Sequence, residues 1–223
     1  MELAIFSESF IAFLFRWVHF LAGITWIGLL YYFNFVQGEY FKEADGGAKS
    51  DVIQKLVPQA LWWFRWGAMF TFLSGAYLLY AFRLSGIGII VGATLGTIMF
   101  LNVWLIIWPN QKVVIASAKQ AAAGGEALAG AAAALGKAGL ASRTNTLFSI
   151  PMLFFMASSR HVGQLQTSIH DLSTASMILV FSLVAVFALN GIVGKTGPFT
   201  SVKGVISGGF LLTAVLYLLI ETM

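Results

Sequence analysis

Six apolar stretches, separated by polar segments, dominate the pattern of residues along this chain. They cover about 9–37, 59–82, 86–108, 143–161, 171–194 and 199–221. Each stretch is close to the roughly 20 residues that a helix needs to cross the hydrocarbon core of a bilayer. The pattern therefore predicts an all-α integral membrane protein, a polytopic bundle of about six transmembrane helices. We expect residues 1–223 to form a single membrane domain.

The longest segment between apolar stretches, residues 112–140, is rich in alanine with glycines interspersed. Alanine is the strongest helix former, whereas glycine lowers helix stability. We therefore expect an Ala-rich cytoplasmic helical extension of the third helix that frays into a loop before the fourth. Within the third helix, Gly88, Gly92 and Gly96 recur every four residues, a spacing that lets neighbouring helices approach closely.

The composition agrees with a membrane protein and limits its chemistry. Hydrophobic residues make up 59% of the chain and charged residues only 10%, far from the averages of soluble domains. Membrane lipid is the expected surrounding, and no nucleic-acid partner is expected. Because the chain has no cysteine, it can form neither disulfides nor thiolate metal sites, and it lacks the Cys-x-x-Cys-His attachment of c-type haem. Any cofactor must be held by other ligands.

The basic residues predict how the helices are oriented. Nine of them fall in the first, third and fifth loops: Lys42, Lys49, Lys55, Lys112, Lys119, Lys137, Arg143, Lys195 and Lys203. The opposite side has only Arg83 and Arg160 near its loops. Cytoplasmic loops are the ones enriched in lysine and arginine, so we expect both termini to be periplasmic.

One face of the first helix carries the strongest candidate site. At 100° per residue, Arg16, His19, Gly23, Trp26 and Leu30 fall within about 80° of one another. Ionisable residues at membrane depth are costly and usually mark a functional site. This stripe is therefore predicted to form a pocket wall or a packing seam in the outer half of the membrane.

Two interpretations of His19 stay open. Its imidazole can donate to a serine, threonine or carbonyl of a neighbouring helix. It can also be an axial ligand of a haem iron, with Gly23 giving room for the flat macrocycle and Trp26 an apolar wall. Arg16, about one turn nearer the outside, would then pair with a haem propionate. The alternative for Arg16 is that its side chain reaches the outer interface.

The other two histidines, His161 and His170, bracket the short connection between the fourth and fifth helices. Their spacing does not match the i, i+4 arrangement of metal ligands on one helix. The first interpretation is that both are exposed loop residues. The second is that one of them supplies the second haem ligand or contacts a substrate.

Four ordered blocks of sequence together resemble a known family. They are RWVHFLAGITWIG (16–28), LWWFRWG (61–67), NVWLIIWPNQ (102–111) and SRTNTLFSIPM (142–152), the last followed by Ser158, Ser159 and His161. These blocks are similar to the N-terminal membrane domain of the bacterial cytochrome c-linked urate hydroxylases, the urate oxidase N-terminal domain. The first block is also loosely similar to the HemJ-type protoporphyrinogen oxidases, in which a first-helix histidine works at a b-type haem.

The resemblance implies a multi-pass oxidoreductase of the bacterial inner membrane that passes electrons from a purine to a cytochrome c domain. It identifies Arg16, His19 and Arg65 as members of the family's motifs. Since this chain has no attachment site for haem c, the expected acceptor is a separate periplasmic cytochrome c. We therefore expect a urate hydroxylase-like protein that binds haem b through His19. The alternative is a non-catalytic structural or assembly subunit of a larger respiratory or oxygenase complex.

Overall fold

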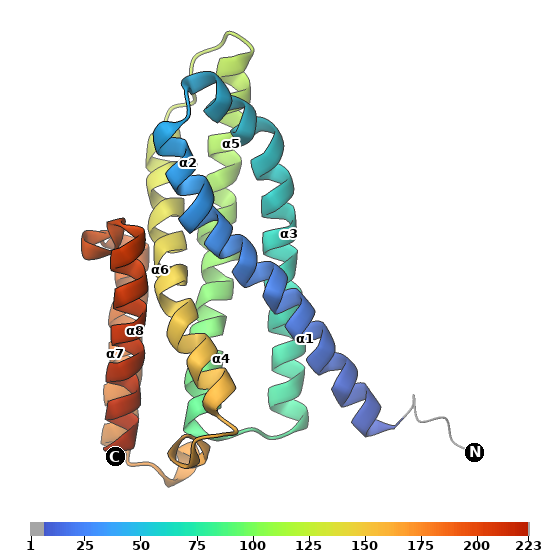
Figure 1. The fold of residues 1–223 in the computed structure, drawn as a ribbon, viewed down its shortest axis with the longest axis vertical. Coiled ribbons are helices and arrows are strands. Elements are labelled where there is room, and N and C mark those ends of the chain that lie inside the picture. Colours follow the sequence, from blue (N-terminus) through green and yellow to red (C-terminus); the bar gives the residue numbers. More distant parts are fainter. Residues whose placement is uncertain (1–6, 223) are drawn as a thin grey trace.

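The computed structural model describes residues 7–222, which form a bundle of long helices running up and down (Figure 1). Two of the long helices contain a π-helical turn, so each is made of three consecutive elements. The first comprises α1 (Glu8–Tyr31), η2 (Tyr32–Gln37) and α2 (Gly38–Glu43). The second comprises α4 (Ile87–Leu101), η3 (Asn102–Ile107) and α5 (Trp108–Ala122). The others are α3 (Gly46–Ala81), α6 (Ala131–Ser158), α7 (Thr174–Val193) and α8 (Val202–Glu221).

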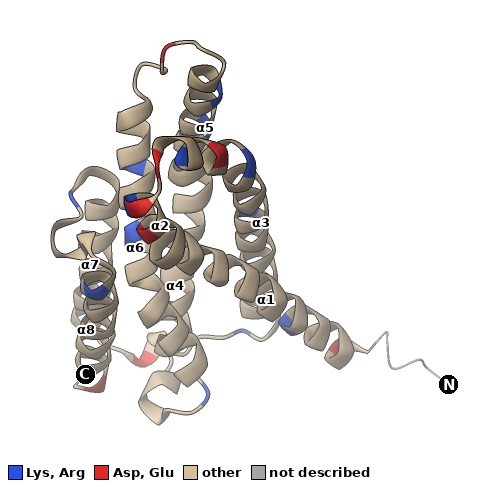
Figure 2. Ribbon diagram, turned by 45° about the horizontal axis from the view of Figure 1, so that its top comes forward, with Lys and Arg blue, Asp and Glu red and all other residues tan. Residues whose placement is uncertain are grey.

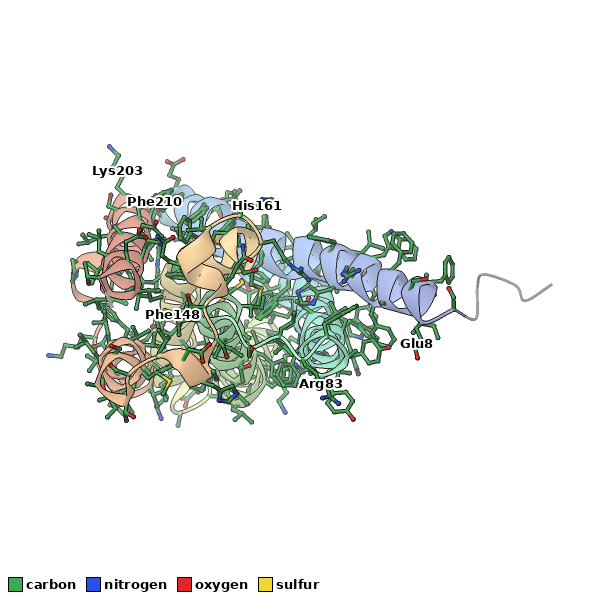
Figure 3. The ribbon with its side chains drawn as sticks, turned by 90° about the horizontal axis from the view of Figure 1, so that it is seen from below. Glu8, Arg83, Phe148, His161, Lys203 and Phe210 are labelled. Atoms are coloured by element: carbon green, nitrogen blue, oxygen red, sulfur yellow. The ribbon has the colours of Figure 1, made fainter. Side chains whose placement is uncertain are left out.

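The predicted all-α class is confirmed, because the described residues form a helical bundle with helices suited to a membrane. The count of about six membrane spans stays a prediction. Four helices are long and apolar enough to span a membrane: Glu8–Glu43, Ile87–Ala122, Thr174–Val193 and Val202–Glu221. Large apolar side chains such as Phe20, Ile24 and Phe210 are exposed on the outside of the bundle, and Figure 3 shows Phe210 on α8 pointing away from it. This outward-facing apolar surface is what a lipid environment requires.

Two helix boundaries differ from the expected ones. The second long helix, expected from about residue 59, begins at Gly46, where the Asp45 side chain caps it by accepting from the Ala48 amide at 2.9 Å. The loop after α5 is short, and two glycines with positive φ, Gly124 and Gly130, delimit it. The alanine-rich segment after Gly130 therefore belongs to α6 and not to a loop. Helix propensity and capping, which do not depend on hydropathy, explain both differences.

Helix α6 lies in the middle of the bundle and contacts α4, α5, α7 and α8. Phe148 of α6 is fully buried there, and Figure 3 labels it among the helices of the bundle. The same helix also buries a polar run, which includes Asn145 and Ser149. Because this polar run faces other helices, α6 stays well packed although it is less apolar than the four helices named above.

Cross-helix hydrogen bonds satisfy this polar run. Asn145 accepts from Asn102 Nδ2 at 2.8 Å and donates through its own Nδ2 to the Met99 carbonyl at 2.9 Å. Ser149 shares a hydrogen bond of 2.9 Å with the Tyr31 hydroxyl. Buried polar groups are costly when they are unpaired, so these bonds fix α6 against α1 and α4.

Both π-helical turns lie where such bonds are made. Asn34 in η2 donates to the Leu30 carbonyl at 2.9 Å and to Ser142 Oγ at 2.8 Å. Asn102 is the first residue of η3. A π-turn shifts the register of the backbone ladder and is frequent at functional sites. Here each π-turn carries a buried asparagine that bonds α6.

The charged residues are distributed unevenly over the bundle. Most lysines and arginines lie at the end where α2 meets α3 and α5 meets α6, and few lie at the opposite end (Figure 2). The described ends of α1 and α8, Glu8 and Glu221, lie at that opposite, sparsely charged end (Figure 1). The orientation that we expect from the positive-inside rule stays a prediction.

Replacing Asn145 with leucine should destabilise the bundle, because the Met99 carbonyl and the Asn102 amide would both lose a partner. We expect the free energy of unfolding to fall by about 1–2 kcal/mol, measured by detergent-induced unfolding followed by circular dichroism. The matched control is Asn110→Leu, since Asn110 Nδ2 donates only to the Ile106 carbonyl of its own helix. Equal losses in both variants would contradict the role assigned to the cross-helix pair.

Candidate functional site

A cavity of about 910 Å³ lies between α1, α3, α4 and α6 in the sparsely charged half of the bundle. Its walls are mainly apolar, and its few polar side chains include Arg16, His19 and Arg160. A volume of several hundred Å³, apolar walls and a few polar groups are the usual features of a site for a small molecule or cofactor. This cavity is the best-formed candidate site of the described residues.

All four site residues expected from the sequence, Arg16, His19, Gly23 and Trp26, line this cavity. The helical stripe therefore forms a pocket wall, as the first of its two interpretations predicts. Leu30, the fifth residue of the stripe, is fully buried in the core and does not line the cavity.

His19 is held from one side by α3. Its Nδ1 atom lies 2.9 Å from the Thr71 carbonyl oxygen and 3.1 Å from Ser74 Oγ. Since Ser74 Oγ donates to the Phe70 carbonyl at 2.5 Å, its lone pairs face an imidazole N–H. Nδ1 is therefore the protonated nitrogen, and Nε2 keeps its lone pair. Among residues 7–222, Nε2 has no hydrogen-bond partner.

A glycine makes this position of the imidazole possible. A Cβ atom on Gly75 would lie 2.9 Å from His19 Cε1 and 3.3 Å from Nδ1. Carbon atoms do not approach each other so closely without displacement. Gly75 therefore leaves the space that the ring occupies, while Gly23 across the interface places its Cβ position 3.9 Å from the Thr71 side chain, an ordinary contact.

Two arginines, Arg16 from α1 and Arg160 just after α6, line the cavity near its charged rim. The Arg16 guanidinium stacks on the Phe82 ring at 4.4 Å. Within residues 7–222, neither arginine forms an ion pair with a carboxylate. The rim of the cavity is therefore positively charged and suited to an anionic group.

Trp26 adds a possible donor to the cavity wall. The residue is 2% exposed, and its Nε1 atom is buried without a hydrogen-bond partner among the described residues. Indole N–H groups in protein interiors usually find an acceptor. An acceptor supplied by a bound molecule would satisfy it.

The structure separates the other two histidines from this site. His161 lies in the turn that follows α6, as Figure 3 shows, and His170 lies in the short 3₁₀ helix η5 (Ile169–Asp171). Both are exposed, and neither lines the cavity. That one of them supplies a second ligand stays a prediction, and the described geometry gives it no support.

Sequence reasoning missed other residues of the site. Thr71, Ser74 and Gly75 come from α3, and the two methionines Met152 and Met156 come from α6. Met156 packs against Gly92, whose Cβ position lies 2.8 Å from Met156 Cγ, so the predicted close approach at this glycine is seen. In the sequence, the repeated glycines of α4 were the only signal for the wall that α4 and α6 form. They predict a close approach of a neighbouring helix, but they do not say which helix it is.

Arg65, which belongs to the second of the four sequence blocks, lies outside this cavity. Its guanidinium stacks on the Trp108 ring at 3.8 Å, and its Nε atom is buried without a partner among the described residues. The second and third sequence blocks therefore meet at an arginine–tryptophan contact between α3 and α5. Among the described residues, no group of three or more histidines and carboxylates is placed to hold a metal ion.

The fold and cavity define an all-α membrane bundle with one histidine-bearing pocket in its sparsely charged half. Residues 80–215 match the model of the urate oxidase N-terminal family. The match covers 136 of the 223 residues, counted inclusively, and the chain belongs to this family. It covers α4 to most of α8, whereas α1 and most of α3 precede it. No curated protein sequence and no solved structure matches the chain.

Adding a methyl group at Gly75 should displace the His19 ring. We expect Gly75→Ala to lower the free energy of unfolding by about 1 kcal/mol, since overpacking costs more than the alanine gains in helix propensity. The matched control is Gly28→Ala, because Gly28 lines the same cavity and its Cβ position has no neighbour within 4 Å. Thermal unfolding in detergent measures both. A Gly75→Ala variant as stable as Gly28→Ala would contradict the contact.

Proposed function

We propose that this protein is a membrane-embedded redox protein of the urate hydroxylase type, which binds b-type haem in the cavity beside His19. The observation that carries the proposal is which ring nitrogen of His19 is protonated and hydrogen-bonded. Because Nδ1 donates to the Thr71 carbonyl, the lone pair of Nε2 is free for an iron ion. A histidine ligand whose other nitrogen is bonded to a backbone carbonyl is the common arrangement at metal centres.

The residues around the cavity fit such a group. Haem needs an axial ligand, apolar walls and partners for its propionates. His19 supplies the ligand, and Arg16 and Arg160 supply cationic partners at the rim. Met152 and Met156 also line the cavity, and a methionine sulfur is a side chain that can ligate haem iron. When bound, haem supplies one-electron chemistry that the side chains lack.

The family supports the direction of electron flow. Membership in the urate oxidase N-terminal family favours a purine as electron donor, and a periplasmic cytochrome c is the proposed acceptor. The cavity opens in the half of the bundle that the positive-inside rule assigns to the outside. Urate-dependent reduction of a soluble cytochrome c by membranes that contain the protein is the activity to test.

The same hydrogen bonds also favour a second candidate function. His19 bonds a carbonyl and a serine of a neighbouring helix, as we expect of a histidine that only joins two helices. In that case the chain is a structural or assembly subunit of a larger membrane complex. A folded sample without haem, purified in fixed stoichiometry with a respiratory or oxygenase complex, would favour this alternative.

Replacing His19 with alanine should abolish haem binding. We expect purified wild-type protein to give a b-type spectrum when reduced with dithionite, and the His19→Ala variant to give none, because the axial ligand is lost. The matched control is Ser74→Ala, which removes one bond to Nδ1 but keeps the Thr71 carbonyl, and which should retain haem. Full haem retention in His19→Ala would contradict the assignment of His19 as the haem ligand.

Replacing Arg16 with glutamine should weaken haem binding by about tenfold, because one charge-assisted hydrogen bond to a propionate is lost. Haem titration of the apoprotein measures the affinity. Arg16→Lys keeps the charge and should restore most of the affinity. Arg83→Gln removes an arginine from the same end that does not line the cavity, and it should bind haem as the wild type does. A similar loss in Arg83→Gln would contradict a specific role of Arg16.

A further inference from the structure

A second cavity, of about 640 Å³, lies at the basic end of the bundle. Its lining residues come from η2 and α2, from α3 between Lys49 and Phe64, from the end of η3 and from α5, from α6, and from the connection between α7 and α8. Most of its walls are apolar. The polar and charged residues that line it are Asn34, Gln37, Lys49, Gln111, Ser142, Arg143, Thr196 and Thr200. No carboxylate is among the described lining residues.

Two polar atoms of this lining are buried and have no hydrogen-bond partner among the described residues: Gln37 Oε1 and Arg143 Nη1. Their needs are complementary, because the first requires a donor and the second an acceptor. Nearby Asn34 and Ser142 bond each other at 2.8 Å and form no hydrogen bond with either of these atoms. An unsatisfied buried group is costly, and for a charged group the cost is larger.

The cavity also carries an excess of positive charge. Neither Arg143 nor Lys49 forms an ion pair within residues 7–222. The Glu39 carboxylate attracts Arg143 without forming an ion pair with it; both of its oxygens accept from Lys42 Nζ at 2.8 Å. Two cations without a dedicated carboxylate favour an anionic ligand.

We propose that this cavity binds a hydroxylated organic phosphate. A phosphate oxygen accepts from Arg143 Nη1 and is attracted by Lys49, while a hydroxyl of the ligand donates to Gln37 Oε1. The apolar part of the ligand lies against side chains such as Phe33 and Phe41. Both the head group of phosphatidylglycerol and a soluble phosphate ester have this chemistry. The site is separate from the haem cavity and does not depend on it.

The test is a binding titration of the delipidated full chain in detergent, followed by native mass spectrometry. The probes are phosphatidylglycerol, phosphatidylcholine with the same acyl chains, and glycerol phosphate. Phosphatidylcholine is net neutral and has no donor for Gln37, so it should bind at least about tenfold more weakly than phosphatidylglycerol. If glycerol phosphate binds as tightly as phosphatidylglycerol, the acyl chains contribute nothing and the ligand is a soluble ester; if only phosphatidylglycerol binds, it is a lipid.

The variants are Arg143→Gln, which removes the cation, and Gln37→Leu, which removes the acceptor. Each should weaken binding of the preferred probe by about tenfold. Lys137→Gln removes an exposed cation from the same helix that does not line the cavity, and it should bind as the wild type does. His19→Ala should also bind normally, which separates this site from the proposed function.

Unchanged affinity in both Gln37→Leu and Arg143→Gln would overturn the proposal, as would the absence of binding to the folded wild type. Ordered water alone would then bridge the two buried atoms. Because Arg143→Gln changes a central helix, thermal unfolding is recorded for each variant. If Arg143→Gln does not fold, Gln37→Leu still decides between the two outcomes.

Discussion

The structure depends on one constraint: the central helix α6 is polar on faces that are buried, and each polar group needs a partner inside the bundle. Water cannot supply that partner in a hydrocarbon environment. The carbonyl of Met99 and the side chain of Asn102 meet this need for Asn145, and Tyr31 meets it for Ser149. The positions of α1 and α4 around α6 follow from these bonds as much as from apolar packing.

The same constraint explains the two cavities. In the sparsely charged half, His19 has one nitrogen satisfied by α3 and the other free. In the basic half, Gln37 and Arg143 have buried atoms without a partner. Arg65 Nε and Trp104 Nε1 are also buried without a partner among the described residues, but neither residue lines one of the two cavities. We infer a ligand at each place because the unpaired atoms line a cavity: the Nε2 lone pair of His19 needs a metal ion or a hydrogen-bond donor, and Arg143 needs an anion.

Much of the fold could be predicted from the sequence, because apolar length is a local property. The helix from Ile87 and the two short helices α7 and α8 lie close to their expected ranges. The early start of α3 at Gly46 could not be read from hydropathy, because its first turns are polar and its start is set by the Asp45 cap. The expected helical extension is confirmed as far as Ala122, where α5 ends. The start of the next helix at Ala131 differs from the expected one, because only the backbone at Gly124 and Gly130 shows where the turn lies.

The candidate site also consists of residues that could be predicted from the sequence and residues that could not. The stripe of Arg16, His19, Gly23 and Trp26 follows from helical periodicity alone, and it lines one cavity. The residues opposite it depend on which helices pack together, and periodicity holds no information about that.

The family match covers one wall of this cavity and not the other. The matched segment, 80–215, contributes the methionines of α6 and Arg160, whereas His19 and its partner Thr71 come before it. The cavity exists only where the two parts meet. A property shared across the family need not include the α1 histidine, and the haem proposal therefore depends on the contact between α1 and α3. That contact is tight at one point. His19 fits against α3 there because Gly75 has no side chain.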